Sequence, residues 1–246
     1  MIPGGSATEQ LEQAVLAEQA GWDGVFVAEL GFGVDAWALL SAIAVRTELV
    51  RLGTMLTPMP WRRPWKLAGQ VATLDQLSNG RAVLAVGVGA VDTGLGTYPE
   101  VTDLRERAAL LDQNIDVVRS LLGGNVVLDD IGLDLTEAVV AAPRPVQARV
   151  PIWCVAVAKP RSMRRVQRCD GLVVQVEETA ELVEMLAWFD ANGGRPADVI
   201  AQGETDPGES DVIASWADAG ATWWLESRWS APDAARARIE AGPVPR

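Results

Sequence analysis

The sequence predicts an α/β fold in which a parallel sheet curls into a barrel surrounded by helices. Short apolar runs alternate with stretches of helical periodicity along nearly the whole chain. Repeated strand–helix units of this kind give parallel sheets with helices packed on them. The length of 246 residues suits one such barrel domain, and hydrophobic residues make up 49% of the chain, enough for a large core. We therefore expect a single domain over residues 1–246.

The expected helices are recognised by their ends as well as by their periodicity. Ser6 and Glu9 form a capping-box pattern that starts the first helix, and Gly21 suits its end. Asp35 and Asp103 are expected to cap two later helices, and Pro232 suits the first turn of the last one. In order, the expected helices are 6–21, 35–46, 64–78, 103–122, 160–168, 179–190, 211–219 and 232–241.

The expected strands number one fewer than a closed barrel needs. They are 25–28, 51–55, 82–86, 152–155, 172–175, 199–202 and 222–225, with a longer irregular segment at 123–150. A (β/α)8 barrel of the TIM type has eight strands, and only Met1-Ile2-Pro3 remains ahead of the first helix to supply another. We therefore expect the first strand to be vestigial or missing. The exposed edge should then be covered by a dimer partner or by the C-terminal segment.

A doubly wound nucleotide-binding sheet is the alternative architecture. It would need a glycine-rich turn after an early strand. The first two strands are followed instead by ELGF at 29–32 and LTPM at 56–59, which lack the required glycines. The barrel is therefore preferred.

Composition excludes several classes of function. The formal net charge of −12 repels nucleic acid and anionic membrane surfaces, so neither is expected as a partner. The start of the chain lacks a signal-peptide pattern, and the two cysteines, Cys154 and Cys169, lack metal-ligand spacing, so a cytoplasmic protein is expected. The chain contains no histidine, which excludes histidine-dependent triads and the common zinc sites, and no metal is expected.

Candidate site residues follow from the rule that barrel function lies at the carboxyl ends of the strands. Glu29 is the candidate catalytic residue, to orient a substrate or accept a proton, or else a carboxylate that caps a loop. Gly87 and Gly89 would let a planar ligand approach the backbone, or form a simple turn. Trp61 is the candidate for stacking on a substrate ring. Arg161 begins a helix where a phosphate could bind, or belongs to a solvated face.

Several segments, in order along the chain, resemble the luciferase-like monooxygenases that use FMN or a deazaflavin coenzyme. They include AEQAGWDGVFV at 17–27, RLGTMLTP at 51–58, ATLDQLSNGR at 72–81, AVGVG at 85–89 and PRPVQ at 143–147. The resemblance implies a cofactor at the carboxyl-end mouth of the barrel, monooxygenation or hydride transfer on a small organic substrate, and dimer formation. It also implies these cofactor contacts: Met55, Thr57, Gly87, Gly89, Ala156, Ala158, Arg161 and Gln175.

The chain departs from this family on the cofactor side. Leu30 follows Glu29 where the family usually has a histidine, so proton transfer would fall to Glu29, water or the flavin. Ala156 and Ala158 stand where the family usually has glycines, and their methyl groups would obstruct a phosphate. Two hypotheses therefore remain beside a flavin- or deazaflavin-dependent oxidoreductase. One is a non-catalytic flavin-binding barrel, and the other is a barrel without cofactor that pairs with a homologue.

Overall fold

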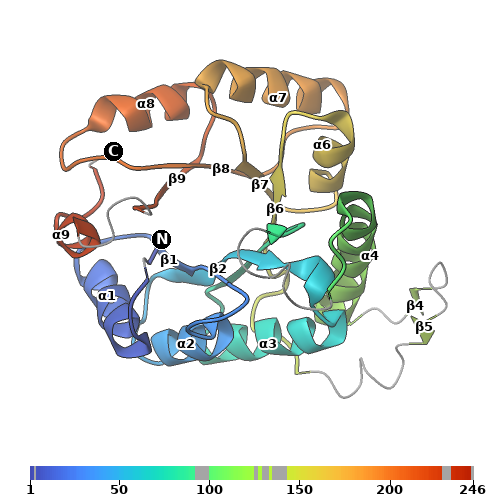
Figure 1. The fold of residues 1–246 in the computed structure, drawn as a ribbon, viewed down its shortest axis with the longest axis horizontal. Coiled ribbons are helices and arrows are strands. Elements are labelled where there is room, and N and C mark those ends of the chain that lie inside the picture. The colour runs from blue at the N-terminus through green and yellow to red at the C-terminus, as the bar shows by residue number, and fades with distance from the viewer. Residues whose placement is uncertain are drawn as a thin grey trace.

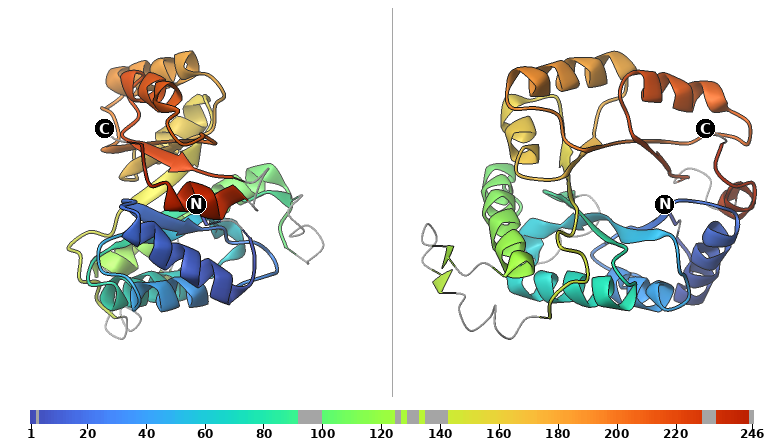
Figure 2. Two further views of the ribbon diagram at one scale, coloured as in Figure 1. Left: turned by 90° about the vertical axis from the view of Figure 1, so that its left-hand side faces the viewer. Right: turned by 180° about the vertical axis from the view of Figure 1, so that it is seen from behind.

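The computed structural model describes residues 1–2, 4–91, 100–124, 127–128, 133–134, 143–228 and 234–244. Within these residues the strands curl about a common axis, and the helices form a ring around them (Figure 1). The same ring is seen from behind in Figure 2. A short antiparallel pair, β4 (Val127–Leu128) and β5 (Leu133–Asp134), lies outside the ring.

The curled sheet contains seven parallel strands, as the sequence predicts. In spatial order they are β1 (Gly24–Val27), β2 (Arg51–Pro58), β3 (Ala82–Gly87), β6 (Ile152–Ala156), β7 (Gly171–Val174), β8 (Asp198–Gly203) and β9 (Trp223–Glu226). Strand β2 extends past its predicted end at 55. After a shift of register it pairs again with β3, through Thr57 with Val86 and Pro58 with Gly87.

The helices also follow the predicted order. They are α1 (Ala7–Gln19), α2 (Ala36–Ala44), η1 (Met59–Trp61), α3 (Pro64–Leu77), α4 (Leu104–Gly123), α6 (Pro160–Val166), α7 (Thr179–Ala191), α8 (Ser210–Asp218) and α9 (Ala235–Glu240). The predicted caps are confirmed: Ser6 and Glu9 bond reciprocally at 2.8 and 3.3 Å, and Asp35 accepts from the Ala38 N–H at 2.8 Å. The predicted start of the last helix at Pro232 lies outside the described residues.

Alternation along the strands divides the apolar side chains into two layers. One set faces the helices, and the other fills the foot of the barrel. In the inner layer the rings of Phe26 and Trp153 stack with centroids 5.3 Å apart. The indoles of Trp153 and Trp223 both donate to Asp198, at 2.9 and 3.2 Å. These aromatic rings fill the foot of the barrel, and the inner wall leads from them toward the carboxyl ends of the strands.

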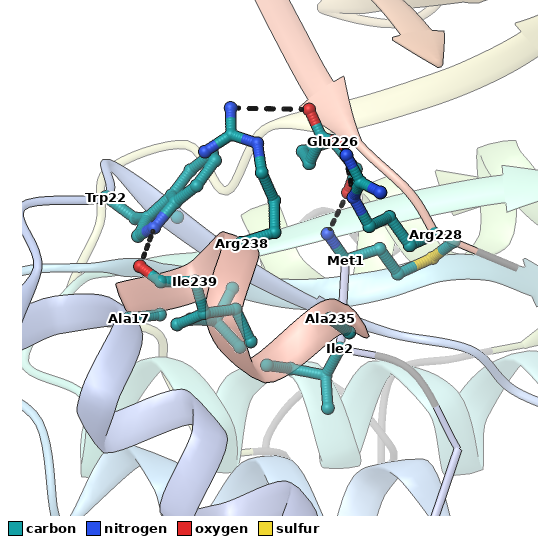
Figure 3. Close-up of a pocket in the computed structure, with 11 residues that line it drawn as sticks. Met1, Ile2, Ala17, Trp22, Glu226, Arg228, Ala235, Arg238 and Ile239 are labelled. Atoms are coloured by element: carbon teal, nitrogen blue, oxygen red, sulfur yellow. Dashed lines mark hydrogen bonds and ion pairs between the residues drawn. The ribbon is translucent and has the colours of Figure 1, made fainter. Parts of the chain in front are cut away.

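The seam between β9 and β1 is closed by residues from both ends of the sequence. Ile2 forms an isolated parallel bridge with Val27, and its N–H donates to the Phe26 carbonyl at 2.9 Å. The amino group of Met1 donates to the Glu226 carbonyl (Figure 3). The predicted vestige of a first strand is therefore present as a two-residue contact.

Helix α9 covers the same seam from outside. Arg238, which is 3% exposed, pairs with Glu226 at 3.5 Å and donates to the carbonyls of Thr205 and Gly242 at 3.0 and 2.6 Å. The indole of Trp22 lies under its guanidinium and donates to the Ile239 carbonyl at 3.0 Å (Figure 3). The expectation that the C-terminal segment covers this edge is therefore met. No helix in the described part of the chain is both long and apolar enough to cross a membrane.

Candidate functional site

A cavity of about 840 Å³ opens at the carboxyl ends of the strands. Its lining comes from the exits of β1, β2, β3, β6, β7 and β8 and from helices α4 and α6. This volume lies within the range of small-molecule and cofactor sites. The structure places six of the predicted site residues on the lining: Glu29, Met55, Gly87, Gly89, Arg161 and Gln175.

One wall of the cavity is apolar. Met55 and Leu56, joined by a cis peptide bond, form it together with Val155 and Val157. Gly87 lies beside them, and a side chain there would come within 2.9 Å of Leu56. A larger residue at position 87 would therefore displace the Leu56 side chain from the wall. The surface that results is suited to the face of a flat ring.

The cavity carries its positive charge at one end. Lys159 and Arg161 follow β6, and Arg105 projects from α4; among the described acids none forms an ion pair with these three. Arg165 also lines the cavity, but Asp112 of α4 holds it through two bonds at 2.7 and 3.1 Å. With no acidic partner in the described part of the chain, these three cations can meet an anionic group.

Glu29 lies on the lining beside the apolar wall, and its carboxylate is held by three donors. Oε2 accepts from the Thr57 hydroxyl at 2.6 Å and from the Trp37 indole at 3.0 Å. Oε1 pairs with Arg62 at 2.9 Å. The three donors fix the position of the carboxylate, so this arrangement suits a hydrogen-bond acceptor that orients a ligand.

Thr57 and Trp61, by contrast, are absent from the cavity lining. Thr57 is fully buried, and its hydroxyl donates to the carboxylate of Glu29, which does line the cavity. The Trp61 indole donates to the Val101 carbonyl at 2.8 Å, and a side chain at Gly89 would lie 2.3 Å from its ring. Arg107 lies over the same ring and donates to the Gly89 carbonyl at 2.6 Å. Trp61 therefore supports the loop after β3, and the predicted stacking on a substrate ring has no support from its position.

Ala156 and Ala158 are likewise absent from the cavity lining. Ala156 is 1% exposed and belongs to the core layer that faces the helices, because alternation along β6 turns Val155 and Val157 toward the cavity. The expected obstruction by the Ala156 methyl group is therefore corrected, and its predicted contact with a cofactor is not supported. Ala158 is exposed but also lies away from the lining.

Many lining residues were outside the predicted site set, among them Leu56, Arg105 and Gln202. Gln202 follows Ile200 by two positions and so shares its inward direction, a signal that alternation along the strand provides. Arg105 belongs to a helix, and only the folded chain brings it to the strand exits. No cluster of three acids or cysteines able to hold a metal ion occurs among the described residues.

Fold and site together define an α/β-barrel protein with a ligand cavity at the carboxyl-end mouth, apolar on one wall and cationic at one end. The chain belongs to the luciferase-like monooxygenase family, whose profile matches residues 2–240.

Two curated relatives show the range of this similarity. The 4-hydroxyprotoasukamycin monooxygenase of Streptomyces nodosus subsp. asukaensis is 33% identical over 131 residues, 50% of this chain and 34% of the relative. An F420-dependent glucose-6-phosphate dehydrogenase of Amycolatopsis mediterranei is 35% identical over 157 residues, 59% of this chain and 46% of the relative. The matched part is thus less than half the length of either relative.

Solved structures agree with the fold. An F420-dependent secondary alcohol dehydrogenase, bound to an F420–acetone adduct, superposes with a TM-score of 0.76 at 17% identity, covering 97% of this chain and 96% of that one. The coenzyme F420-dependent tetrahydromethanopterin reductase of Methanopyrus kandleri gives 0.73 at 17% identity, covering 98% and 95%. At these identities the likeness establishes the barrel architecture.

Proposed function

We propose that this chain forms the barrel of an oxidoreductase that binds a flavin-type coenzyme in the cavity and acts on a small organic substrate. The observation that carries the proposal is that one cavity combines an apolar wall at Met55 and Leu56 with Lys159 and Arg161, which pair with none of the described acids. FMN and the deazaflavin coenzyme share the matching design, a flat ring system with a phosphate-bearing tail.

The residues present fit such a group. The cavity volume of about 840 Å³ suits a ring and tail, the apolar wall suits the ring, and the cations suit the phosphate. The methyl group of Ala156, which the sequence suggested as an obstruction, points toward the helices.

Of the two coenzymes we favour the deazaflavin over FMN. Arg105 adds a third unpaired cation beyond those that a single phosphate needs, and the deazaflavin tail carries carboxylates as well as a phosphate. Relatives named for F420 dependence support the same choice. FMN is the competing outcome of the test below.

The bound coenzyme would supply hydride transfer or oxygen chemistry at its ring. The chain itself supplies orientation and exclusion of water. Val155, Val157 and Leu56 form the dry wall, while the fixed carboxylate of Glu29 has capacity to accept one more hydrogen bond from a ligand. The cofactor does the redox chemistry, and these residues set its position.

Titration of the purified protein with the deazaflavin coenzyme and with FMN, followed by coenzyme fluorescence, tests the proposal. Arg161→Gln is expected to weaken binding about tenfold, because one charge-assisted contact is lost. Arg164→Gln is the matched control, since Arg164 is exposed on the same helix and lies off the cavity. If neither coenzyme binds, or both variants behave alike, the proposal is wrong.

We also propose that the chain self-associates or pairs with a homologue, as the family resemblance implies. Light scattering on the purified chain, with and without coenzyme, tests this prediction.

A further inference from the structure

Two glutamines stand side by side at the mouth of the barrel. Val173 of β7 pairs in parallel register with Ile200 of β8, and Gln175 and Gln202 each follow two residues later. Residues two apart on a strand point to the same face. The two amides therefore occupy the same level of neighbouring strands.

Both amides face the cavity. Val173 and Ile200 belong to the inner layer of the barrel, so the residues two positions on continue that inner face. Gln175 and Gln202 are accordingly both on the cavity lining. The inner wall beneath them is apolar, with Val173, Ile200 and Leu225 buried there. The pair is thus a local polar feature on an otherwise apolar surface.

Neither amide is used to hold the fold together. No residue in the described ranges hydrogen-bonds to the side chain of Gln175 or Gln202, and both side chains are exposed in the open cavity. Glutamines with a structural role look different: Gln147 donates to Asp75 at 2.6 Å, and Gln76 donates to the Arg144 carbonyl at 2.7 Å. The hydrogen-bonding capacity of the pair is available to a ligand.

The pair comes from other strands than the rest of the polar lining: Gln175 follows β7, the neighbour of β6, and Gln202 belongs to β8. In the strand order β1-β2-β3-β6-β7-β8-β9, strand β8 is separated from β2 by β3, β6 and β7, so the curl of the sheet sets β8 across the barrel from β2 (Figure 1), the strand that carries Met55 and Leu56. A ring lying on that apolar wall would turn its free face toward the pair. The unpaired cations come from other elements, the segment after β6 and α4.

We propose that Gln175 and Gln202 bind the carbonyl or hydroxyl group of a neutral substrate. The inference rests on the proposed function, since it assigns the opposite wall to the coenzyme ring. Each amide offers two N–H donors and one carbonyl acceptor, so the pair can satisfy a ketone, an amide or an alcohol. A carboxylate or phosphate would gain more from a cation than from two neutral amides. The pair therefore selects for uncharged polar groups on an apolar framework.

The test uses the full chain, labelled with nitrogen-15, both saturated with coenzyme and without it. Cyclohexanone and cyclohexanol are the neutral probes, and cyclohexanecarboxylate is the charged probe of similar size. Side-chain amide resonances of Gln175 and Gln202 are assigned from Gln175→Met and Gln202→Met, which keep length and shape. Gln113→Met, an exposed position on α4 away from the lining, is the matched control.

The neutral probes are expected to shift both amide resonances. Gln175→Met and Gln202→Met are each expected to bind these probes about fivefold more weakly than the wild type and Gln113→Met do. Tighter binding of the carboxylate, unchanged affinity in the methionine variants, or no binding of either neutral probe would each overturn the inference. If the coenzyme titration shows no binding, the proposed function is contradicted, but the inference about the glutamines is not. The probe titration without coenzyme still measures whether Gln175 and Gln202 bind the neutral probes.

Discussion

At the scale of single residues, the carboxylate of Glu29 joins three parts of the chain. Its partners Trp37, Thr57 and Arg62 come from α2, β2 and the segment after η1. A residue at the end of a barrel strand is thus fixed before any ligand arrives. The sequence identified Glu29 by its position, but the three donors come from distant segments, and no local pattern indicates them.

Glu29→Gln is expected to lower the free energy of unfolding by about 1 kcal/mol, because Arg62 loses its charged partner while the other two donors keep an acceptor. Urea unfolding measures the change. Glu12→Gln, at an exposed position of α1, is the control and should change stability by less than about 0.5 kcal/mol. An equal effect in both variants would show that the Arg62 contact contributes nothing.

Asp170, between α6 and β7, provides a test that depends on pH. Burial acts to raise the pKa of this carboxyl, but hydrogen bonds from a backbone N–H and two arginines outweigh burial, so its pKa lies below the ordinary value. A carboxyl with a lowered pKa in the folded state adds stability above its unfolded pKa of about 3.9, and this contribution disappears as pH falls through the folded value.

Asp170→Asn is therefore expected to lower the free energy of unfolding by about 2 kcal/mol near neutral pH, and by progressively less below about pH 4. Urea unfolding across this pH range measures the gap, which is the difference in free energy of unfolding between the wild type and the variant. Asp190→Asn breaks an exposed pair with Arg195 and should give a small gap at every pH. A gap for Asp170 that stays constant down to about pH 3 would contradict the assignment.

At the scale of elements, the strand–helix rhythm was predictable because alternation and helical periodicity are local properties of the sequence. Strand β2 was underestimated, since its last residues pair with β3 only after a register shift that no local pattern reveals. The predicted cofactor contact of Ala156 is not supported, for a related reason. A shift of one position along β6 decides whether a side chain faces the cavity or the helices.

Helices α4 and α6 are joined by Asp112 and Arg165, whose side chains are 29% and 5% exposed. A double-mutant cycle with Asp112→Ala and Arg165→Met is expected to give a coupling of about 2 kcal/mol. The exposed pair Asp190 and Arg195, tested in the same way, should couple much more weakly. Equal coupling in the two cycles would mean that burial does not strengthen the first pair.

At the scale of the whole molecule, the barrel is completed by contacts between segments that are far apart in the sequence. Ile2 and α9 meet the seam between β9 and β1, where Arg238 of α9 pairs with Glu226 of β9 (Figure 3) and donates to the Thr205 carbonyl. The shortened first strand could be predicted by counting strands. The role of Arg238 could not, because its partners Thr205, Glu226 and Trp22 are distributed along the chain.

Arg238→Met is expected to lower the free energy of unfolding by about 3 kcal/mol, because a buried ion pair with Glu226 and the hydrogen bonds to the carbonyls of Thr205 and Gly242 are lost together. Arg236→Met on the same helix removes only an exposed pair with Glu240 and should cost less than about 0.5 kcal/mol. Urea unfolding followed by circular dichroism measures both. A loss in the Arg238 variant no larger than in the control would show that the seam does not depend on this residue.

The shared acceptor at the foot of the barrel has an optical consequence. Asp198 holds the indoles of Trp153 and Trp223 inside the strands, on the same inner wall that leads up to the cavity. Indole emission overlaps the absorption of flavin-type rings, and resonance energy transfer falls off steeply with distance. Excitation near the indole band should therefore reveal a filled cavity through lost emission from this pair, so that the protein carries its own label-free sensor of occupancy.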